Sequence, residues 1–123
     1  LVVILAGYSN EIMHFIDSNP GLESRFNRYI HFDDYSYEEL MRIFIFNLNK
    51  NDYKITREAF VAVGNMIKDQ LAKKSLKFGN ARFVRNLFET IILEQANRLA
   101  CCEQMPSKED LMLITINDLG NIK

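Results

Sequence analysis

A chain of 123 residues with 48% hydrophobic and 25% charged residues has the composition of one globular domain rather than of a disordered segment. Lys and Arg together number 15 and Asp and Glu 16, so the formal net charge of −1 offers no general attraction to nucleic acid or to an anionic membrane. Any anion-binding site must therefore be local, and we expect neither nucleic acid nor a membrane as a partner.

The cysteine and histidine content argues against a metal site. Cys101 and Cys102 are adjacent, which fits neither an ordinary disulfide nor the separated cysteine pairs of a zinc site. The only histidines, His14 and His31, lie far from both cysteines in the sequence. We therefore expect no bound metal, reduced thiols and a cytoplasmic protein.

The chain opens on the apolar run Leu1-Val2-Val3-Ile4-Leu5-Ala6-Gly7. This run is too short to cross a bilayer and has no basic flank of the kind that precedes a signal sequence, whereas a Val/Ile/Leu run ended by glycine is typical of a strand buried on both faces of a parallel sheet. Such a strand needs neighbours on both sides, so we expect the chain to be part of something larger. Left alone, residues 1–6 should pair with another copy, swap or fray.

A short helix and an edge strand are predicted next. Tyr8-Ser9-Asn10 is a polar turn that leads into a helix over residues 11–17, and Ser18-Asn19-Pro20-Gly21 is a strong turn signal. Residues 22–27 then form a loop or one helical turn. Residues 28–33 alternate polar and apolar side chains, as a strand near a sheet edge does.

The pair Asp33-Asp34 has two interpretations. Adjacent acids after a semi-apolar run resemble the pair that holds Mg²⁺ in nucleotide hydrolases. Alternatively, they end the strand and lead into a helix cap, which is favoured because no phosphate-binding glycine loop precedes them and His31 interrupts the run.

From Ser36 onwards the pattern is helical and predicts a small bundle. Ser36 with Glu39 forms a capping box before a helix over residues 40–48, and Thr56 caps a second helix that reaches about Lys74. A long helix is expected from Asn80 to about Cys102. After a break at 106–107, residues 108–113 should be a short helical or extended piece, and residues 115–118 a cap and turn.

Two arginines lie at the start of the long helix. The first N–H groups and the macrodipole already make a helix start electropositive, so Arg82 and Arg85 are mildly unfavourable there unless an anion is near. A phosphate is one candidate. The structural alternative is an exposed arginine that pairs with Glu89, which follows Arg85 at helical spacing.

Four motifs occur in order along residues 1–100 and together resemble the second half of an AAA+ ATPase module. Within that superfamily, the chain is most similar to the group of stage V sporulation protein K and the rubisco-activase-like CbbX proteins. The motifs are Leu5-Ala6-Gly7-Tyr8, then Asn19-Pro20-Gly21-Leu22 with Ser24-Arg25-Phe26, then Asp34-Tyr35-Ser36 with Glu38-Glu39-Leu40, and finally Phe78-Gly79-Asn80-Ala81-Arg82 with Val84-Arg85-Asn86-Leu87-Phe88.

This resemblance implies a fold and a set of site residues. Residues 1–35 would be the last strands of a P-loop-type parallel sheet, an incomplete α/β nucleotide-binding core, and residues 36–123 the helical lid. Arg25 would be the arginine finger that reaches the nucleotide of a neighbouring subunit, and Arg82 the sensor-2 arginine that reaches the phosphates of its own subunit, with Gly79 beside it. The sensor-1 region corresponds to Tyr8, Ser9 and Asn10, without a choice among them. Arg28 and Arg85 are secondary candidates with structural roles.

The resemblance also implies cofactors and partners. The intact protein would bind ATP and Mg²⁺ and hydrolyse ATP in a ring, a hexamer, to remodel a protein partner. The chain contains no G-x-x-x-x-G-K-[ST] loop, so by itself it should neither hydrolyse ATP nor hold it tightly. The alternative function is a helical interaction module in which Phe44, Phe46 and Phe60 dock a partner helix.

Overall fold

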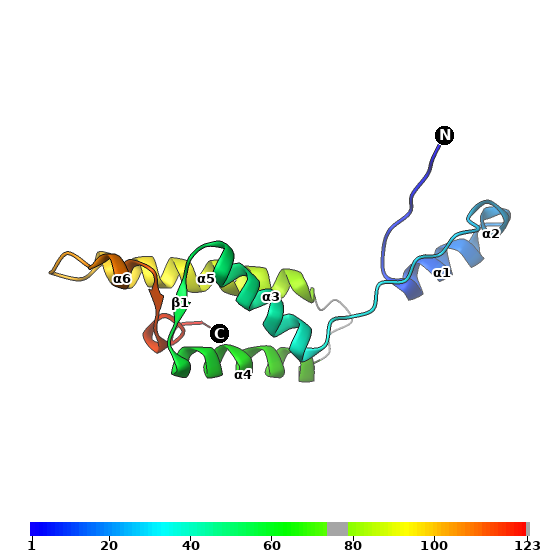
Figure 1. Cartoon of the computed structure of the whole chain (residues 1–123). Helices are drawn as coiled ribbons and strands as arrows, with labels where there is room; N and C mark the ends of the chain where they lie inside the picture. Colours follow the sequence, from blue (N-terminus) through cyan, green and yellow to red (C-terminus); the bar gives the residue numbers. More distant parts are fainter. Residues whose placement is uncertain (74–78, 123) are drawn as a thin grey trace. The chain divides into compact units, whose positions relative to one another are not determined.

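The computed structural model describes residues 1–73 and 79–122 and divides into two compact units, Leu1–Asp33 and Asp34–Lys123. Figure 1 shows the helices of both units. Each unit is described by itself below.

The first unit contains two helices. Helix α1 (Ser9–Ser18) carries Glu11 in its first turn, where a carboxylate is favourable, and the predicted short helix is confirmed. Gly21 then adopts a left-handed conformation (φ 87°), which glycine reaches without steric cost, and α2 (Leu22–Arg25) follows as the expected helical turn.

The strands expected over residues 1–6 and 28–33 are absent from this unit. Both segments run without regular secondary structure, and they leave large apolar side chains in solvent: Val2 and Ile4 are each 85% exposed and Phe32 is 86% exposed. The prediction was wrong for this unit by itself, because apolar content and alternation indicate only which faces of a strand are buried, whereas a strand forms through hydrogen bonds to a neighbouring backbone. A P-loop-type sheet therefore remains a prediction.

The second unit is the predicted helical bundle. Its main helices are α3 (Tyr37–Lys50), α4 (Arg57–Lys73) and α5 (Ala81–Ala100), followed by the short α6 (Lys108–Leu111) and the 3₁₀ turn η1 (Ile116–Asp118). The capping box at Ser36 is present, with the Glu39 N–H donating to Ser36 Oγ at 3.2 Å. Thr56 Oγ1 accepts from the Ala59 N–H at 3.3 Å at the start of α4. The expected end of that helix near Lys74 lies outside the described residues.

Helices α3, α4 and α5 enclose one apolar core. Phe44 of α3 is completely buried and meets Phe88 of α5 edge to face, with ring centroids 6.1 Å apart. Phe60 packs against the same core, whereas Phe46 is 63% exposed. The interaction-module hypothesis is therefore wrong for Phe44, because its ring is completely buried inside the unit, whereas Phe60 is only partly buried.

A two-stranded parallel sheet, which the sequence did not predict, closes the bundle. Strand β1 (Lys54–Ile55) pairs with β2 (Leu113–Ile114), in the register Lys54 with Leu113 and Ile55 with Ile114. The Lys54 N–H donates to the Met112 carbonyl at 2.7 Å and the Thr56 N–H donates to the Ile114 carbonyl at 3.0 Å. This pairing places Ile114 in the core.

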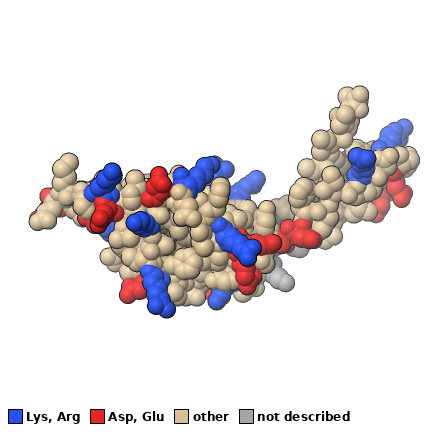
Figure 2. Space-filling view, viewed as in Figure 1, with Lys and Arg blue, Asp and Glu red and all other residues tan. Residues whose placement is uncertain are grey.

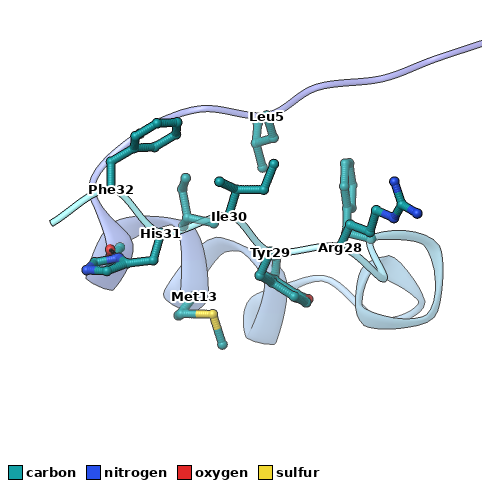
Figure 3. A pocket seen from close by; sticks show the side chains of 12 residues that line it. Leu5, Met13, Arg28, Tyr29, Ile30, His31 and Phe32 are labelled. Atoms are coloured by element: carbon teal, nitrogen blue, oxygen red, sulfur yellow. Dashed lines mark hydrogen bonds between the residues drawn. The ribbon is translucent and has the colours of Figure 1, made fainter.

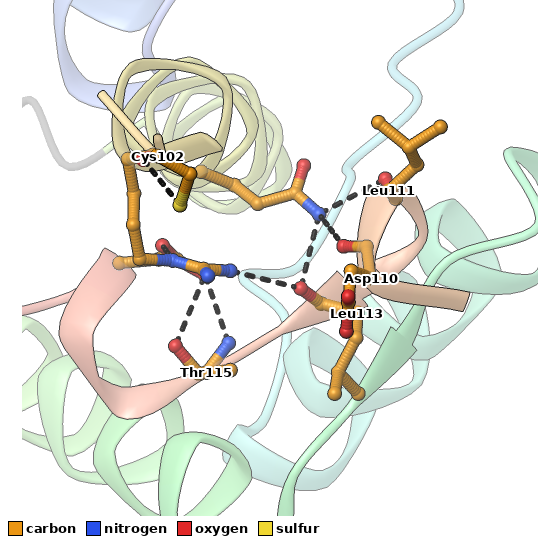
Figure 4. Close-up of polar contacts among 8 residues, drawn as sticks. Cys102, Asp110, Leu111, Leu113 and Thr115 are labelled. Atoms are coloured by element: carbon orange, nitrogen blue, oxygen red, sulfur yellow. Dashed lines mark hydrogen bonds and ion pairs between the residues drawn. The ribbon is translucent and has the colours of Figure 1, made fainter. Parts of the chain in front are cut away.

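A partly buried polar network holds the residues after α6 against α5 (Figure 4). Arg98 Nε donates to Asp118 Oδ1 at 2.6 Å, and Asp118 Oδ2 accepts from the Thr115 N–H at 2.8 Å. The hydrogen bond from Arg98 to Asp118 raises the pKa of Arg98 above its ordinary value, against the opposing effect of burial. Gln95, also buried, donates through Nε2 to the carbonyls of Leu111 and Leu113, each at 3.0 Å.

The surface of the second unit carries charges of both signs. On the face seen in Figure 2, basic and acidic side chains are interspersed over the helices instead of forming a field of one sign. Over residues 1–73 and 79–122, we found no helix both long and apolar enough to cross a membrane.

Candidate functional site

The start of α5 presents an exposed arginine in an electropositive position. Arg82 is the second residue of the helix, no acidic side chain lies in its first turn, and the Arg82 N–H donates to the Gly79 carbonyl at 2.8 Å. The Arg82 side chain has no ion-pair or hydrogen-bond partner within the described part of the chain. A guanidinium so placed offers several N–H donors to an arriving anion.

The unusual backbone at this helix start belongs to Asn80 rather than to Gly79. Asn80 has φ 43° and ψ −114°, a conformation that non-glycine residues rarely adopt. A Cβ added at Gly79 would meet Arg82 Cβ at 3.6 Å, an ordinary contact. Gly79 is thus not required here for steric reasons, and its predicted role beside Arg82 stays a prediction.

Arg85 differs from Arg82 in having a partner. Its Nε donates to Glu89 Oε1 at 3.2 Å, and both side chains are largely exposed. The structural alternative is therefore confirmed for Arg85, as an i,i+4 surface pair worth about 0.3–0.5 kcal/mol. Arg82 remains as the arginine of this turn that is open to an anion.

Arg25, the predicted finger, ends α2. Its Nη1 donates to the Gly21 carbonyl at 3.0 Å, and the residue is exposed. The expected alternative, a pair with Glu23 or an aspartate, is not formed among the described residues. One hydrogen bond to an exposed carbonyl is a weak restraint, so Arg25 can leave it for a stronger acceptor.

The three sensor-1 candidates lie where α1 begins. Tyr8 precedes the helix and its carbonyl accepts from the Ile12 N–H at 2.9 Å, while Asn10 is exposed on the first turn. Ser9 Oγ lies 3.2 Å from His31 Nδ1, and His31 Nε2 lies 3.1 Å from Asp33 Oδ1. Within the described part of the chain, Ser9 is the one of the three whose side chain forms a hydrogen bond to a distant segment. Sequence reasoning missed His31 as its partner, because the two residues are 22 positions apart and only the fold brings them together.

A cavity of about 370 Å³ lies in the first unit beside these residues. It is lined mainly by apolar side chains, and in Figure 3 Leu5 of the first segment points toward Ile30 of the second. Ile12 and Ile16 of α1 line it as well, with Arg28 and His31 among the polar members. Such a lining favours contact with apolar groups rather than binding of a phosphate.

The acidic pair Asp33-Asp34 is divided between different partners. Asp33 contacts His31, and Asp34 Oδ1 accepts from Asn80 Nδ2 at 2.5 Å. Nowhere in the described ranges do three potential metal-ligating side chains gather. This favours the interpretation of the pair as structural rather than as a Mg²⁺ site.

Residues 36–123 match the family described as AAA lid domain. The chain therefore belongs to the AAA lid domain family. The lid begins at the capping residue Ser36, so it includes the α3–α5 bundle, the β1–β2 pairing and Arg82.

Curated relatives extend the similarity beyond the lid. The chain is 42% identical over 120 residues to stage V sporulation protein K of Bacillus subtilis. The aligned region is 97% of this chain and 37% of that protein. It is 42% identical over 106 residues to protein CbbX of Cereibacter sphaeroides, covering 86% of the chain and 34% of that protein. It is 38% identical over 120 residues to the chloroplastic ribulose bisphosphate carboxylase/oxygenase activase of Cyanidioschyzon merolae, covering 97% of the chain and 40% of that protein. The resemblance deduced from the motifs is thus confirmed, and the chain spans roughly two fifths of the length of these relatives.

Proposed function

We propose that this chain is the C-terminal part of an AAA+ ATPase module, in which an ATP-driven ring, a hexamer, remodels a protein partner. Membership of the lid family and similarity to stage V sporulation protein K, CbbX and the activase support this proposal. The observation that carries it is Arg82, exposed on the first turn of α5 with no carboxylate in that turn, while Arg85 is paired with Glu89.

Arg82 is proposed as the sensor-2 residue, which contacts the phosphates held by its own subunit. A cation at a helix start costs about 0.3–1 kcal/mol through the macrodipole, and an anion placed there reverses the sign of that interaction. The start of α5 is thus a favourable position for a phosphate group, because the positive end of the helix dipole and the exposed Arg82 are on the same turn. Bound ATP would supply the phosphoryl group whose transfer the module catalyses, and Arg82 would stabilise its charge from the lid.

Arg25 is proposed as the arginine finger, which acts on a neighbouring subunit. It is exposed at the end of a one-turn helix, and its single hydrogen bond to the Gly21 carbonyl leaves four of its five N–H donors available. An arginine finger contributes about 10³ to 10⁵-fold to phosphoryl transfer. Turnover would then depend on contact between subunits.

We propose Ser9, the member of the sensor-1 region that contacts His31, as the residue that orients the attacking water.

Magnesium is assigned to the rest of the module. The carboxylates of Asp33 and Asp34 bond to different partners, and the described residues offer no cluster of three ligands. Among the described residues, neither aspartate is thus directed with the other toward a shared Mg²⁺ position, and the role that we propose for the arginines is to stabilise negative charge.

The test uses the full-length protein and its ATP turnover. We expect Arg25→Ala to lower turnover by about 10³-fold or more, and Arg82→Ala by about 10²-fold, the loss typical of one charge-stabilising donor. Arg85→Ala is the matched control, because it removes a cation from the same turn, one that is paired with Glu89. The turnover of this variant should stay within about twofold of that of the unmodified protein. Full turnover in both Arg25→Ala and Arg82→Ala would refute the site assignment.

A mixing experiment separates action within a subunit from action on its neighbour. A subunit with Arg25→Ala retains its own Arg82, and a neighbour with Arg82→Ala retains its Arg25. Roughly a quarter of the interfaces in a randomly mixed ring would then have both arginines, so two inactive variants should regain activity together. No recovery on mixing would contradict the assignment of the two arginines to different subunits.

A further inference from the structure

The division between the two units falls between the adjacent aspartates. Asp33 is the last residue of the first unit and Asp34 the first residue of the second. Each carboxylate contacts a residue of its own unit, Asp33 with His31 and Asp34 with Asn80. The peptide bond between them is thus where the chain passes from one unit into the other.

The Asp34–Asn80 contact joins the starts of two core helices. Asp34 lies two residues before Ser36, the cap of α3, and Asn80 directly precedes α5. Asn80 Nδ2 donates to Asp34 Oδ1 at 2.5 Å, a short charge-assisted hydrogen bond between residues 46 positions apart. Asn80 thus uses its side chain to hold α3 and α5 together at their N-terminal ends, and it makes no side-chain cap to α5.

The same contact restrains the backbone from which Arg82 projects. Asn80 keeps a positive φ of 43°, which costs free energy in a residue with a side chain and persists only where surrounding contacts maintain it. The Asn80 carbonyl accepts from the Val84 N–H at 3.3 Å, so this conformation sets the direction of the first turn of α5. Arg82 lies on that turn.

We propose that Asp34 and Asn80 are positioning residues, which hold Arg82 in the orientation in which it contacts the phosphates. This inference rests on the proposed function of Arg82. A displacement of about 1 Å in a positioned group can cost about 10²-fold in rate.

The first experiment measures ATP turnover of the full-length protein carrying Asp34→Ala or Asn80→Ala, each with Arg82 present and with Arg82→Ala. We expect each single variant to lower turnover about tenfold, with little change in the KM for ATP. The double variant Asp34→Ala with Asn80→Ala should lose no more turnover than either single variant. On the Arg82→Ala background neither change should lower turnover further. A loss of similar size on that background would overturn the proposal, because the pair would then act independently of Arg82.

The exchanged pair Asp34→Asn with Asn80→Asp is the rescue variant. It places the amide donor on residue 34 and the carboxylate on residue 80, so one hydrogen bond can form again at the same net charge. We expect turnover to return to within about threefold of the unmodified protein. A rescue variant as slow as Asp34→Ala would contradict positioning through this hydrogen bond.

Hydrogen exchange of the backbone gives a readout that does not depend on activity. Asp34→Ala should speed amide exchange in the first turn of α5, whereas Asp33→Ala, which removes the adjacent carboxylate and its contact with His31, should leave that turn unchanged. Unchanged exchange in Asp34→Ala would refute the positioning role. If exchange responds as expected but Arg82→Ala retains full turnover, the assignment of Arg82 fails while the structural link stands.

Discussion

The ion pair between Arg98 and Asp118 provides a quantitative test of what holds the lid together. The Asp118 side chain is fully buried, while the Arg98 side chain is 30% exposed. Replacing Arg98 by Met leaves a buried carboxylate whose remaining donors among the described residues belong to Thr115, with N at 2.8 Å and Oγ1 at 3.5 Å. Because loss of one partner of a buried pair costs about 3–5 kcal/mol, we expect Arg98→Met to lower the free energy of unfolding by that amount.

The reverse change should cost less. Asp118→Asn leaves a cation that water reaches in part, and the asparagine Oδ1 can still accept from the Thr115 N–H, so we expect a loss of about 1–3 kcal/mol. The double variant Arg98→Met with Asp118→Asn should be more stable than Arg98→Met alone, since it leaves no uncompensated charge.

Urea unfolding of the chain, followed by far-UV circular dichroism, measures these differences. The pKa of Arg98 is raised in the folded chain, so the stability that its charge contributes is present below the unfolded pKa and disappears only in strongly alkaline solution. Arg98 therefore stays charged in the neutral range, and its titration should not make the loss of unfolding free energy in Arg98→Met depend on pH there. A cost below about 1 kcal/mol, as for a surface pair, or a double variant as unstable as the sum of the singles, would refute the reasoning.

Two further predictions concern packing, and urea unfolding measures both. Phe44→Ala should cost about 3–5 kcal/mol, because this ring is fully buried against Phe88, whereas Phe46→Ala, two residues away and 63% exposed, should stay within about 0.5 kcal/mol. Equal costs would contradict the assignment of the core. Gly64→Ala places a Cβ 2.7 Å from Tyr37 Oη, which offsets the gain of about 1 kcal/mol expected from alanine inside α4. On a Tyr37→Phe background that gain should appear, and the same effect in both backgrounds would show that the hydroxyl is not the obstacle.

The helices could be predicted because their signals are local. Ser36 with Glu39 and Thr56 mark helix starts through bonds to residues three positions away, and both are observed. The Arg85–Glu89 pair was likewise accessible from its spacing along one helix.

Features that depend on distant partners were not accessible in this way. The apolar run at residues 1–6 has the composition of a buried strand, but pairing requires a neighbour that composition does not supply. Strands β1 and β2 are too short to show any periodicity. The Asp34–Asn80 bond joins residues 46 positions apart, and only the fold brings them together.

The parallel pairing of residues 54 and 113 has a consequence for the order of folding. It closes a loop of about 60 residues, and closing such a loop costs entropy that local helix formation does not. Ile114 and Leu119 complete the core, yet α3, α4 and α5 are all synthesised before them. During translation the three helices would therefore expose the apolar surface that these two residues later cover, and the lid becomes fully protected only in its last step of assembly.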